Sequence, residues 1–214
     1  MSIGIIGAGQ IGSAFARALA KNSIGATIAN SRGPETLGEF VKELSPSITA
    51  GTIAGAASAD IVLVAVPWSQ LPKALAGLPD WNGRIVIDAN NPIEAPLFQP
   101  AELNGRLSTE IFTDLVPGAR VVKAFNHLQP HLISGDPRAE GGNRVLFYSG
   151  DDPRAKAEVG ALIGRLRHRP RSRLRRRQAR AVPRRAAPRA QPGEIRLTSR
   201  HQTKGSAGDQ VSGC

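Results

Sequence analysis

Short apolar runs alternate with amphipathic segments over the first 164 residues of this chain. Apolar, β-rich runs predict strands at 2–6, 26–29, 48–50, 61–66, 84–88, 120–125 and 145–149. Helical spacing of apolar residues predicts helices at 13–20, 34–44 and 69–78, a further helix from 108, and a last one from 153 to about 166. Because strands alternate with helices, we predict a doubly wound α/β fold of the Rossmann type with a mostly parallel sheet.

A glycine-rich segment, 7–12, joins the first predicted strand to the first predicted helix. It consists of Gly7, Ala8, Gly9, Gln10, Ile11 and Gly12 and fits the pattern G-x-G-x-x-G. In this context the first glycine permits a tight turn, the second lets the backbone approach a pyrophosphate, and the third lets helix and strand pack closely. Free amides at the positive end of the helix then face the anion, so the segment predicts a dinucleotide site.

Asn30, Ser31 and Arg32 follow the second predicted strand, where dinucleotide-binding folds usually carry an acidic ligand for the ribose. A carboxylate there would repel a 2′-phosphate, whereas a serine hydroxyl and a guanidinium suit one. We therefore predict NADP rather than NAD as the cofactor. The alternative is that Asn30 and Ser31 only form a turn before Pro34 and that Arg32 is solvated.

The last fifty residues differ in composition from the rest of the chain. Residues 1–164 carry 13 Lys or Arg and 15 Asp or Glu, whereas residues 165–214 carry 15 and 2. Every Phe, Trp and Tyr lies before residue 165, so the tail has too few large apolar residues to build a core. We predict an NADP-binding Rossmann domain at 1–164 and a disordered basic tail, rich in Arg, Pro and Ala, at 165–214.

The cysteine and histidine content excludes several other classes of protein. A single cysteine, Cys214, excludes a disulfide framework and favours a reducing compartment. No apolar stretch reaches the ~18 residues that a membrane span needs, so we expect a cytoplasmic protein with no membrane partner. His131, His168 and His201 show no metal-ligand spacing with cysteines or carboxylates, and we predict no metal site.

Polar residues follow several of the predicted strands. In doubly wound sheets ligands bind beyond the carboxyl ends of the strands. Those ends carry residues 65–68, 88–92, 123–127 and 149–152, which we expect to form one mouth.

The side chains in this mouth allow more than one role. His127 could donate a proton and Lys123 could neutralise a developing anion, but both also suit structural roles. We expect Asp88 to be a hydrogen-bonding residue at a strand end rather than a base. Trp68 either stacks on a cofactor or anchors the start of a helix. We assign no catalytic residue.

The order of these motifs resembles that in the NADP oxidoreductases that exchange hydride with the deazaflavin coenzyme F420, and in related dinucleotide-binding proteins. The likeness covers residues 1–164 and rests on the segments 7–12, 30–32, 65–67, 91–92, 123–126 and 149–152. It implies that the glycine segment holds the pyrophosphate, that Ser31 and Arg32 hold the 2′-phosphate, and that Val66 and Pro67 lie near the nicotinamide ribose. The implied cofactor-binding residues are Gly7, Ala8, Gly9, Gln10, Ile11, Gly12, Asn30, Ser31, Arg32, Ala65, Val66, Pro67 and Asn91.

The resemblance implies hydride transfer between NADP(H) and a second ring cofactor, such as coenzyme F420, or a small acceptor. Such a transfer needs no side-chain nucleophile, because the protein mainly aligns two rings and excludes water. Related proteins carry a C-terminal segment that helps to close the second ring site and often contains Pro-Gly-Gly-Pro-Leu. One G/C-rich coding of residues 182–191, displaced by one base, reads Phe-Pro-Gly-Gly-Pro-Leu-His-Ala-Leu. A frameshift near Gly164 is therefore a hypothesis for the tail, and it would impair the acceptor site.

Two other classes of function stay open. The first is a non-catalytic NADP-binding sensor of redox state. The second is nucleic-acid binding by the basic run at 166–177, which would be non-specific and salt-sensitive because the tail offers no aromatic side chains for base stacking. Since the tail is explained better by a frameshift, we do not expect nucleic acid as a partner. The sequence leaves the acceptor, the direction of transfer and the oligomeric state open, with a homodimer as one option.

Overall fold

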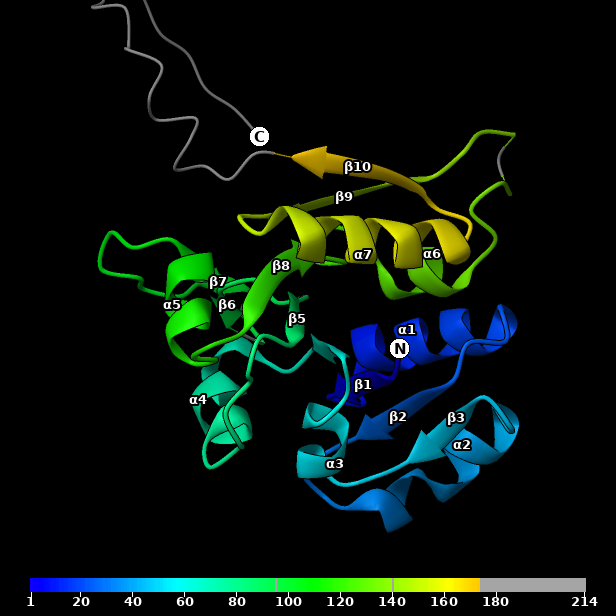
Figure 1. Cartoon of the computed structure of the whole chain (residues 1–214), viewed down its shortest axis with the longest axis horizontal. Coiled ribbons are helices and arrows are strands. Elements are labelled where there is room, and N and C mark those ends of the chain that lie inside the picture. The colour runs from blue at the N-terminus through cyan, green and yellow to red at the C-terminus, as the bar shows by residue number, and fades with distance from the viewer. Residues whose placement is uncertain (95, 140, 174–214) are drawn as a thin grey trace, which may run out of the picture. The chain divides into compact units, whose positions relative to one another are not determined.

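A computed structural model describes residues 1–94, 96–139 and 141–173 (Figure 1). The helices and strands follow one another in the order β1 (Ile3–Ile6), α1 (Gln10–Lys21), β2 (Ala26–Ala29), η1 (Pro34–Leu37), α2 (Gly38–Glu43), β3 (Ile48–Ala50), α3 (Ile53–Ala57), β4 (Ile61–Val64), η2 (Trp68–Gln70), α4 (Leu71–Leu75), β5 (Ile85–Asp88), β6 (Ile93–Glu94), β7 (Gln99–Pro100), α5 (Ser108–Asp114), β8 (Arg120–Ala124), α6 (Pro130–Ser134), β9 (Val145–Gly150), α7 (Pro153–Arg165) and β10 (Arg169–Arg173), where η marks a 3-10 helix.

Within these residues, an eight-stranded sheet has the order β10-β9-β8-β5-β4-β1-β2-β3. Strands β3, β2, β1, β4, β5 and β8 run parallel to one another; Ile5, for example, pairs with Ile28 on one side and Leu63 on the other. Strand β9 runs antiparallel to β8, and β10 runs parallel to β9. The fold is therefore the α/β fold of the Rossmann type that the sequence predicts, with a mostly parallel sheet.

Both faces of the central strands are buried, because successive side chains point to opposite sides of a strand. Ile5 and Leu63 belong to a core cluster that includes residues of α1, α6 and α7. Ile6 and Val64 belong to a second cluster, which includes residues of α3, α4 and α5. Strands covered on both faces carry apolar residues at consecutive positions, which explains the unbroken runs in the sequence.

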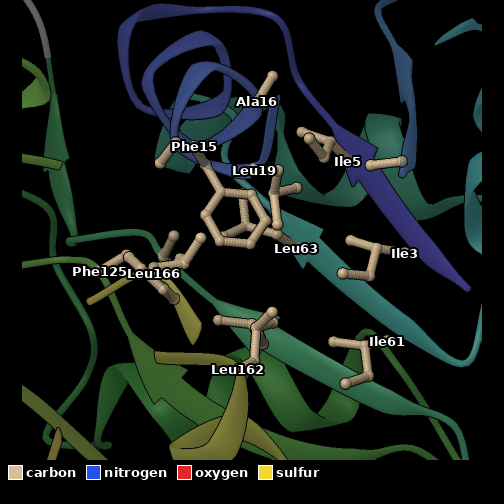
Figure 2. Packing of buried hydrophobic residues seen from close by; sticks show 14 of the residues in the cluster. Ile3, Ile5, Phe15, Ala16, Leu19, Ile61, Leu63, Phe125, Leu162 and Leu166 are labelled. Atoms are coloured by element: carbon tan, nitrogen blue, oxygen red, sulfur yellow. The ribbon is translucent and has the colours of Figure 1, made fainter. Parts of the chain in front are cut away.

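The side chain of Phe15 anchors α1 on the sheet. Its ring is fully buried and lies 4.9 Å from the ring of Phe125 in an edge-to-face arrangement. Leu162 and Leu166 belong to the same cluster of buried side chains (Figure 2). Full burial of a Phe side chain contributes roughly 1.5–3 kcal/mol to the stability of the folded state. This packing fixes the N-terminus of α1 beside the carboxyl end of β1.

Several elements differ from the sequence prediction. Strands β2 and β3 are confirmed at their predicted bounds, but α1 begins at Gln10, inside the glycine segment. The predicted helix at 34–44 is divided into η1 and α2, and the helix predicted at 69–78 is a 3-10 turn followed by a short α4. The strand predicted at 61–66 ends at Val64. Helices α3 and α6 and strands β6 and β7 were not predicted, because elements of two to five residues are too short to show a period.

Residues 165–173, predicted as the start of the tail, are ordered parts of the described structure. Arg165 is the last residue of α7, and residues 169–173 form β10 beside β9 (Figure 1). Leu166 and His168 are both 3% exposed. Backbone pairing with β9 and the burial of Leu166 and His168 hold this stretch against the rest of the domain. The domain boundary stays a prediction, and the expected disorder from residue 174 onward lies outside the described residues.

Candidate functional site

The glycine segment forms a tight connection between β1 and α1. Gly7 has a φ of 107°, and a Cβ there would lie 2.2 Å from the carbonyl oxygen of Ala65. A Cβ on Gly12 would lie 1.8 Å from the carbonyl oxygen of Gly7. By contrast, a Cβ on Gly9 would meet no atom within 4 Å. The first and third glycines are therefore required by close packing, whereas the second faces open space.

The N-terminus of α1 offers unpaired backbone amides. Gly9 is its N-cap residue, and within the described part of the chain no side chain caps its first turn. The first N–H groups of a helix have no partner inside the helix, and the aligned peptide dipoles make this end positive. An anion that approaches over Gly9 can accept hydrogen bonds from these amides.

The segment 30–32 combines a turn with free polar side chains. The Asn30 Oδ1 accepts a hydrogen bond from the Arg32 amide at 2.8 Å, and the Asn30 Nδ2 donates to the Thr36 Oγ1 at 2.9 Å. Asn30 thus holds the backbone, as the turn interpretation expected. Ser31 and Arg32 are exposed, and among the described residues no carboxylate pairs with the Arg32 guanidinium. These two side chains are available to an anion.

These segments line one cleft of about 550 Å³. Its walls include residues 7–9, 30–32 and 65–67, together with Gln70 and Lys73. The structure therefore brings together the three predicted segments from the ends of β1, β2 and β4. Sequence reasoning missed Lys73; its only signal was a basic residue on the helix that follows the 65–67 loop. None of the described residues lining this cleft is acidic.

A second cleft of about 400 Å³ adjoins the first. Both are lined by Gly9 and by residues 65–67. The second cleft also contains the predicted residues Gln10, Ile11 and Asn91. Its other lining residues include Trp68, Asn126 and Leu128. Because the clefts share a wall, one elongated ligand can extend from the first into the second.

A buried polar network supports this shared wall. Lys123 Nζ lies 2.8 Å from the Asp88 Oδ2 and donates to the carbonyl oxygen of Asn90 at 2.6 Å. The Asn90 Nδ2 donates to the Asp88 Oδ1 at 2.9 Å, and its Oδ1 accepts from the Val66 amide at 3.1 Å. The network links β5 and β8 to the 65–67 loop. The geometry agrees with the hydrogen-bonding role expected of Asp88 and the structural role of Lys123.

Two asparagines join the ends of β5 and β8 at the second cleft. The Asn91 Nδ2 donates to the carbonyl oxygen of Asn126 at 2.7 Å, and the Asn126 Nδ2 donates to the Asn91 Oδ1 at 3.1 Å. Phe125, with a φ of 63°, turns the backbone between β8 and this pair. Asn126 was not among the predicted site residues, although its place after a strand pointed to the mouth.

His127 has a structural contact. Its Nε2 accepts a hydrogen bond from the amide of Phe147 at 3.2 Å, and the two rings lie 5.6 Å apart. The imidazole thus joins the end of β8 to β9. We assign it no proton-transfer role.

The expectation that residues 149–152 belong to the mouth is wrong. Because β9 runs antiparallel to β8, its carboxyl end lies at the opposite edge of the sheet. There Asp152 caps α7 by accepting a hydrogen bond from the Ala155 amide at 2.7 Å. Its Oδ1 lies 3.8 Å from Nη1 of Arg120, the first residue of β8. The sequence pattern indicates where each strand lies along the chain, but not whether the strand runs parallel or antiparallel to its neighbour.

The described ranges 1–94, 96–139 and 141–173 contain no group of three or more His, Cys, Asp or Glu placed to hold a metal ion. Within the same ranges no helix is long and apolar enough to cross a membrane. His131 lies in α6 and His168 is buried, whereas His201 and Cys214 lie outside the described residues.

Known proteins resemble this chain in sequence and in fold. Residues 2–92 match the protein family described as NADP oxidoreductase, coenzyme F420-dependent. A hypothetical protein from Sinorhizobium meliloti is 44% identical, with a TM-score of 0.77 over 81% of this chain and 85% of that one. A candidate F420-dependent NADP reductase from Arthrobacter sp. FB24 is 28% identical, with a TM-score of 0.65 over 84% of this chain and 87% of that one.

A reductive aminase from Aspergillus terreus, solved with NADPH and ethyl-5-oxohexanoate, is 20% identical and has a TM-score of 0.60. The likeness covers 81% of this chain and 55% of the aminase, and at this identity it shows the shared fold alone. No curated protein matches the sequence.

Proposed function

From the premise that the chain belongs to the family of coenzyme F420-dependent NADP oxidoreductases, we propose that it binds NADP(H) in the first cleft and exchanges hydride with an acceptor in the second. One observation carries this proposal. A single cleft gathers the glycine segment, Ser31 and Arg32, and none of its described lining residues is acidic.

We place the activity in the cytoplasm, since a chain with one cysteine has no disulfide framework.

The residues of the first cleft fit the charges of NADP. The amides at the start of α1 would hold the pyrophosphate, and the open space over Gly9 lets it approach. The Ser31 hydroxyl and the Arg32 guanidinium would hold the 2′-phosphate, because a guanidinium forms paired hydrogen bonds to phosphate oxygens. A carboxylate that would repel this phosphate is absent from the described lining residues.

The residues around the shared wall would orient the reacting rings. Bound NADPH supplies a hydride that an acceptor can take up. The 65–67 loop forms the wall between the clefts, and the network of Asp88, Asn90 and Lys123 holds it in place. A rigid wall lowers the entropic barrier to hydride transfer by fixing both rings. No side-chain nucleophile is needed.

We propose that the acceptor is a planar ring such as the deazaflavin of coenzyme F420. The second cleft offers the indole of Trp68 and the side chain of Leu128 for contact with a ring. Asn91 and Asn126 add amide groups that can hydrogen-bond to its polar edge. The family description names the same coenzyme.

The test is a calorimetric titration of the full chain with NADPH and with NADH, followed by oxidation of bound NADPH with a panel of deazaflavin, flavin and quinone acceptors. The proposal expects tighter binding of NADPH and turnover with the deazaflavin. Equal affinity for both coenzymes, or binding of neither, overturns the NADP assignment. Turnover with flavin or quinone alone overturns the deazaflavin assignment.

We further propose that the tail impairs the acceptor site because it is read out of frame. Two residues where the tail begins do not suit their positions. Arg167, just after α7, has a φ of 63°, and its amide donates to the carbonyl oxygen of Gly164 at 2.9 Å. This left-handed position after a helix strongly favours glycine.

His168 is the second misfit. It is 3% exposed, and its Nδ1 has no hydrogen-bond partner among the described residues. Its Nε2 lies 3.4 Å from the carbonyl oxygen of Ile133, a long contact. A buried, unpartnered nitrogen costs about 1–3 kcal/mol, so an apolar side chain suits this position better.

A one-base displacement resolves both misfits. If residues 167–169 are written CGG-CAT-CGC and Pro170 as CCC, the displaced frame reads GGC-ATC-GCC, which encodes Gly-Ile-Ala. It places glycine at the left-handed position and isoleucine at the buried one. This observation, independent of the shifted reading of residues 182–191, favours a frameshift close to Leu166.

The DNA that encodes residues 164–214 tests the frameshift. We expect a displaced frame that is open throughout and encodes glycine and an apolar residue at positions 167 and 168. A stop codon in that frame, or a charged residue at either position, rules the frameshift out. The protein read from the displaced frame should oxidise NADPH with an acceptor faster than the present chain does.

A non-catalytic NADP sensor is the second candidate, because the first cleft by itself supplies all the proposed contacts to NADP and needs no acceptor site. NADPH that binds but is oxidised by no acceptor, also in the frame-restored protein, would support the sensor. Nucleic-acid binding would depend on the basic run at 166–177, of which residues 174–177 lie outside the described residues. It would weaken steeply with salt and leave NADPH binding intact.

A further inference from the structure

Lys73 lines the first cleft together with Arg32. Arg32 follows β2, whereas Lys73 lies in α4, so the two cations reach the cleft from separate elements. Both side chains are exposed. Within the part of the chain that the structure describes, neither forms an ion pair or a side-chain hydrogen bond. Two unpaired cations therefore face one cleft.

The charge of this cleft is unbalanced. Its described lining residues include these two cations and no Asp or Glu. Like charges in one cleft repel each other, and a bound anion relieves that repulsion. A phosphate monoester carries about −1.5 to −2 charges near pH 7, which two cations neutralise more completely than one.

The pyrophosphate and the 2′-phosphate of the proposed ligand differ in the positive groups that the site described so far places near them. The pyrophosphate has the amides and the positive end of α1 at Gly9. The 2′-phosphate has only Ser31, which is neutral, and Arg32, whose one positive charge faces a phosphate that is close to a dianion. A lysine ammonium on its flexible stem suits the remaining charge, because it acts as a compact point charge without a fixed fork.

We propose that Lys73 is the second cation that binds the 2′-phosphate, so that the preference for NADP depends on Lys73 and Arg32 together. This inference rests on the proposed NADP site and names a further residue that determines its specificity. The two side chains act from separate elements and hold the phosphate between them. Removal of either one lowers affinity only for ligands that carry this phosphate.

The experiment compares the full chain with its K73M, R32A and K156M variants. Methionine keeps most of the length of lysine and removes its charge. Lys156, in α7, lines neither cleft and serves as the matched control. The titrants are NADPH and NADH, and also adenosine 2′,5′-bisphosphate and adenosine 5′-phosphate, since each pair differs only by the 2′-phosphate.

For K73M we expect about a tenfold loss of affinity for NADPH and for the bisphosphate, the size of one charge-assisted hydrogen bond. Affinity for NADH and for the monophosphate should stay within twofold of the unchanged chain. K156M should match the unchanged chain for all four ligands. Added salt should weaken NADPH binding by the unchanged chain more than by K73M, because K73M has lost one screened charge pair.

The outcomes separate this inference from the proposed function. Equal losses for both coenzymes place Lys73 at a group common to them, such as the pyrophosphate, and overturn the inference alone. No loss in K73M together with a selective loss in R32A also overturns it and leaves the NADP site standing. If the unchanged chain binds neither coenzyme, the proposed function fails and Lys73 loses its ligand. Matching thermal melting curves exclude misfolding as the cause of a loss.

Discussion

Lys123 Nζ lies 2.8 Å from the Oδ2 of Asp88, a carboxylate that is 0% exposed. The pair joins β8 to β5 directly beneath the residues that begin the mouth. Because Asn90 bridges Asp88 to the Val66 amide, the ion pair also positions the loop between the two clefts. A structural contact and the proposed ring alignment therefore depend on the same two side chains.

Lys123→Met should lower the free energy of unfolding by about 3 kcal/mol, because it leaves the Asp88 carboxylate buried without its partner. The double variant Lys123→Met, Asp88→Asn should recover part of this loss, since the uncompensated charge is gone. Urea unfolding of the four proteins in the cycle measures both effects. A single-variant loss under about 1 kcal/mol would show that the pair is effectively solvated.

The second and third glycines of the loop, Gly9 and Gly12, should respond differently to alanine. Gly12→Ala should destabilise the fold by 2 kcal/mol or more, roughly the cost of an overpacked site, because its Cβ would lie 1.8 Å from a carbonyl oxygen. Gly9→Ala should leave stability nearly unchanged and reduce NADPH affinity, since its Cβ meets no protein atom within 4 Å. Equal unfolding midpoints for the two variants would contradict the close packing at Gly12.

Stability should fall in mild acid because of His168. Its burial, opposed by the contact with Ile133 and reinforced by the positive charge of Arg144, lowers the pKa of the imidazole below 6.5. The unfolded chain therefore takes up a proton that the folded chain resists, and stability is complete above pH 6.5 and declines as the pH falls through the lowered pKa.

Urea midpoints at about pH 7.5 and about pH 5.5 measure this effect, since they bracket the ordinary histidine range. His168→Leu should remove most of the difference between them. Asp60 does not interfere: hydrogen bonds from Ser2 lower the pKa of its carboxyl from 3.8, so its contribution is lost only in stronger acid. An unchanged pH dependence in His168→Leu would assign the effect to other groups.

Arg167→Gly should stabilise the present chain by about 1 kcal/mol, because glycine adopts a left-handed backbone without the penalty of a Cβ. The matched control is Arg165→Gly, the last residue of α7, which should lose up to about 1 kcal/mol because glycine disfavours a helix. Thermal unfolding of both variants measures the contrast. If both substitutions destabilise, the φ of Arg167 is not under strain.

Most residues of the first cleft could be predicted from the sequence, because they belong to short motifs whose residues are close together in the chain. Gly7 and Gly12 are required by a turn between neighbouring elements, and Arg32 stands at a fixed distance along the chain from that turn. Lys73 could not be found in this way. Its place in the cleft depends on how α4 packs on the sheet, and a short helix with one basic residue carries no sign of that packing.

The sequence by itself determined the strand–helix alternation, the glycine turn and the absence of a carboxylate after β2, because each is written in adjacent residues. Only the tertiary structure decided that β9 runs antiparallel to β8. Asp152 therefore lies near Arg120, at the opposite edge of the sheet from the mouth. A strand repeats every two residues whichever way it runs. Its direction depends on the connection that precedes it and on the neighbour it pairs with, and neither is encoded in the strand itself.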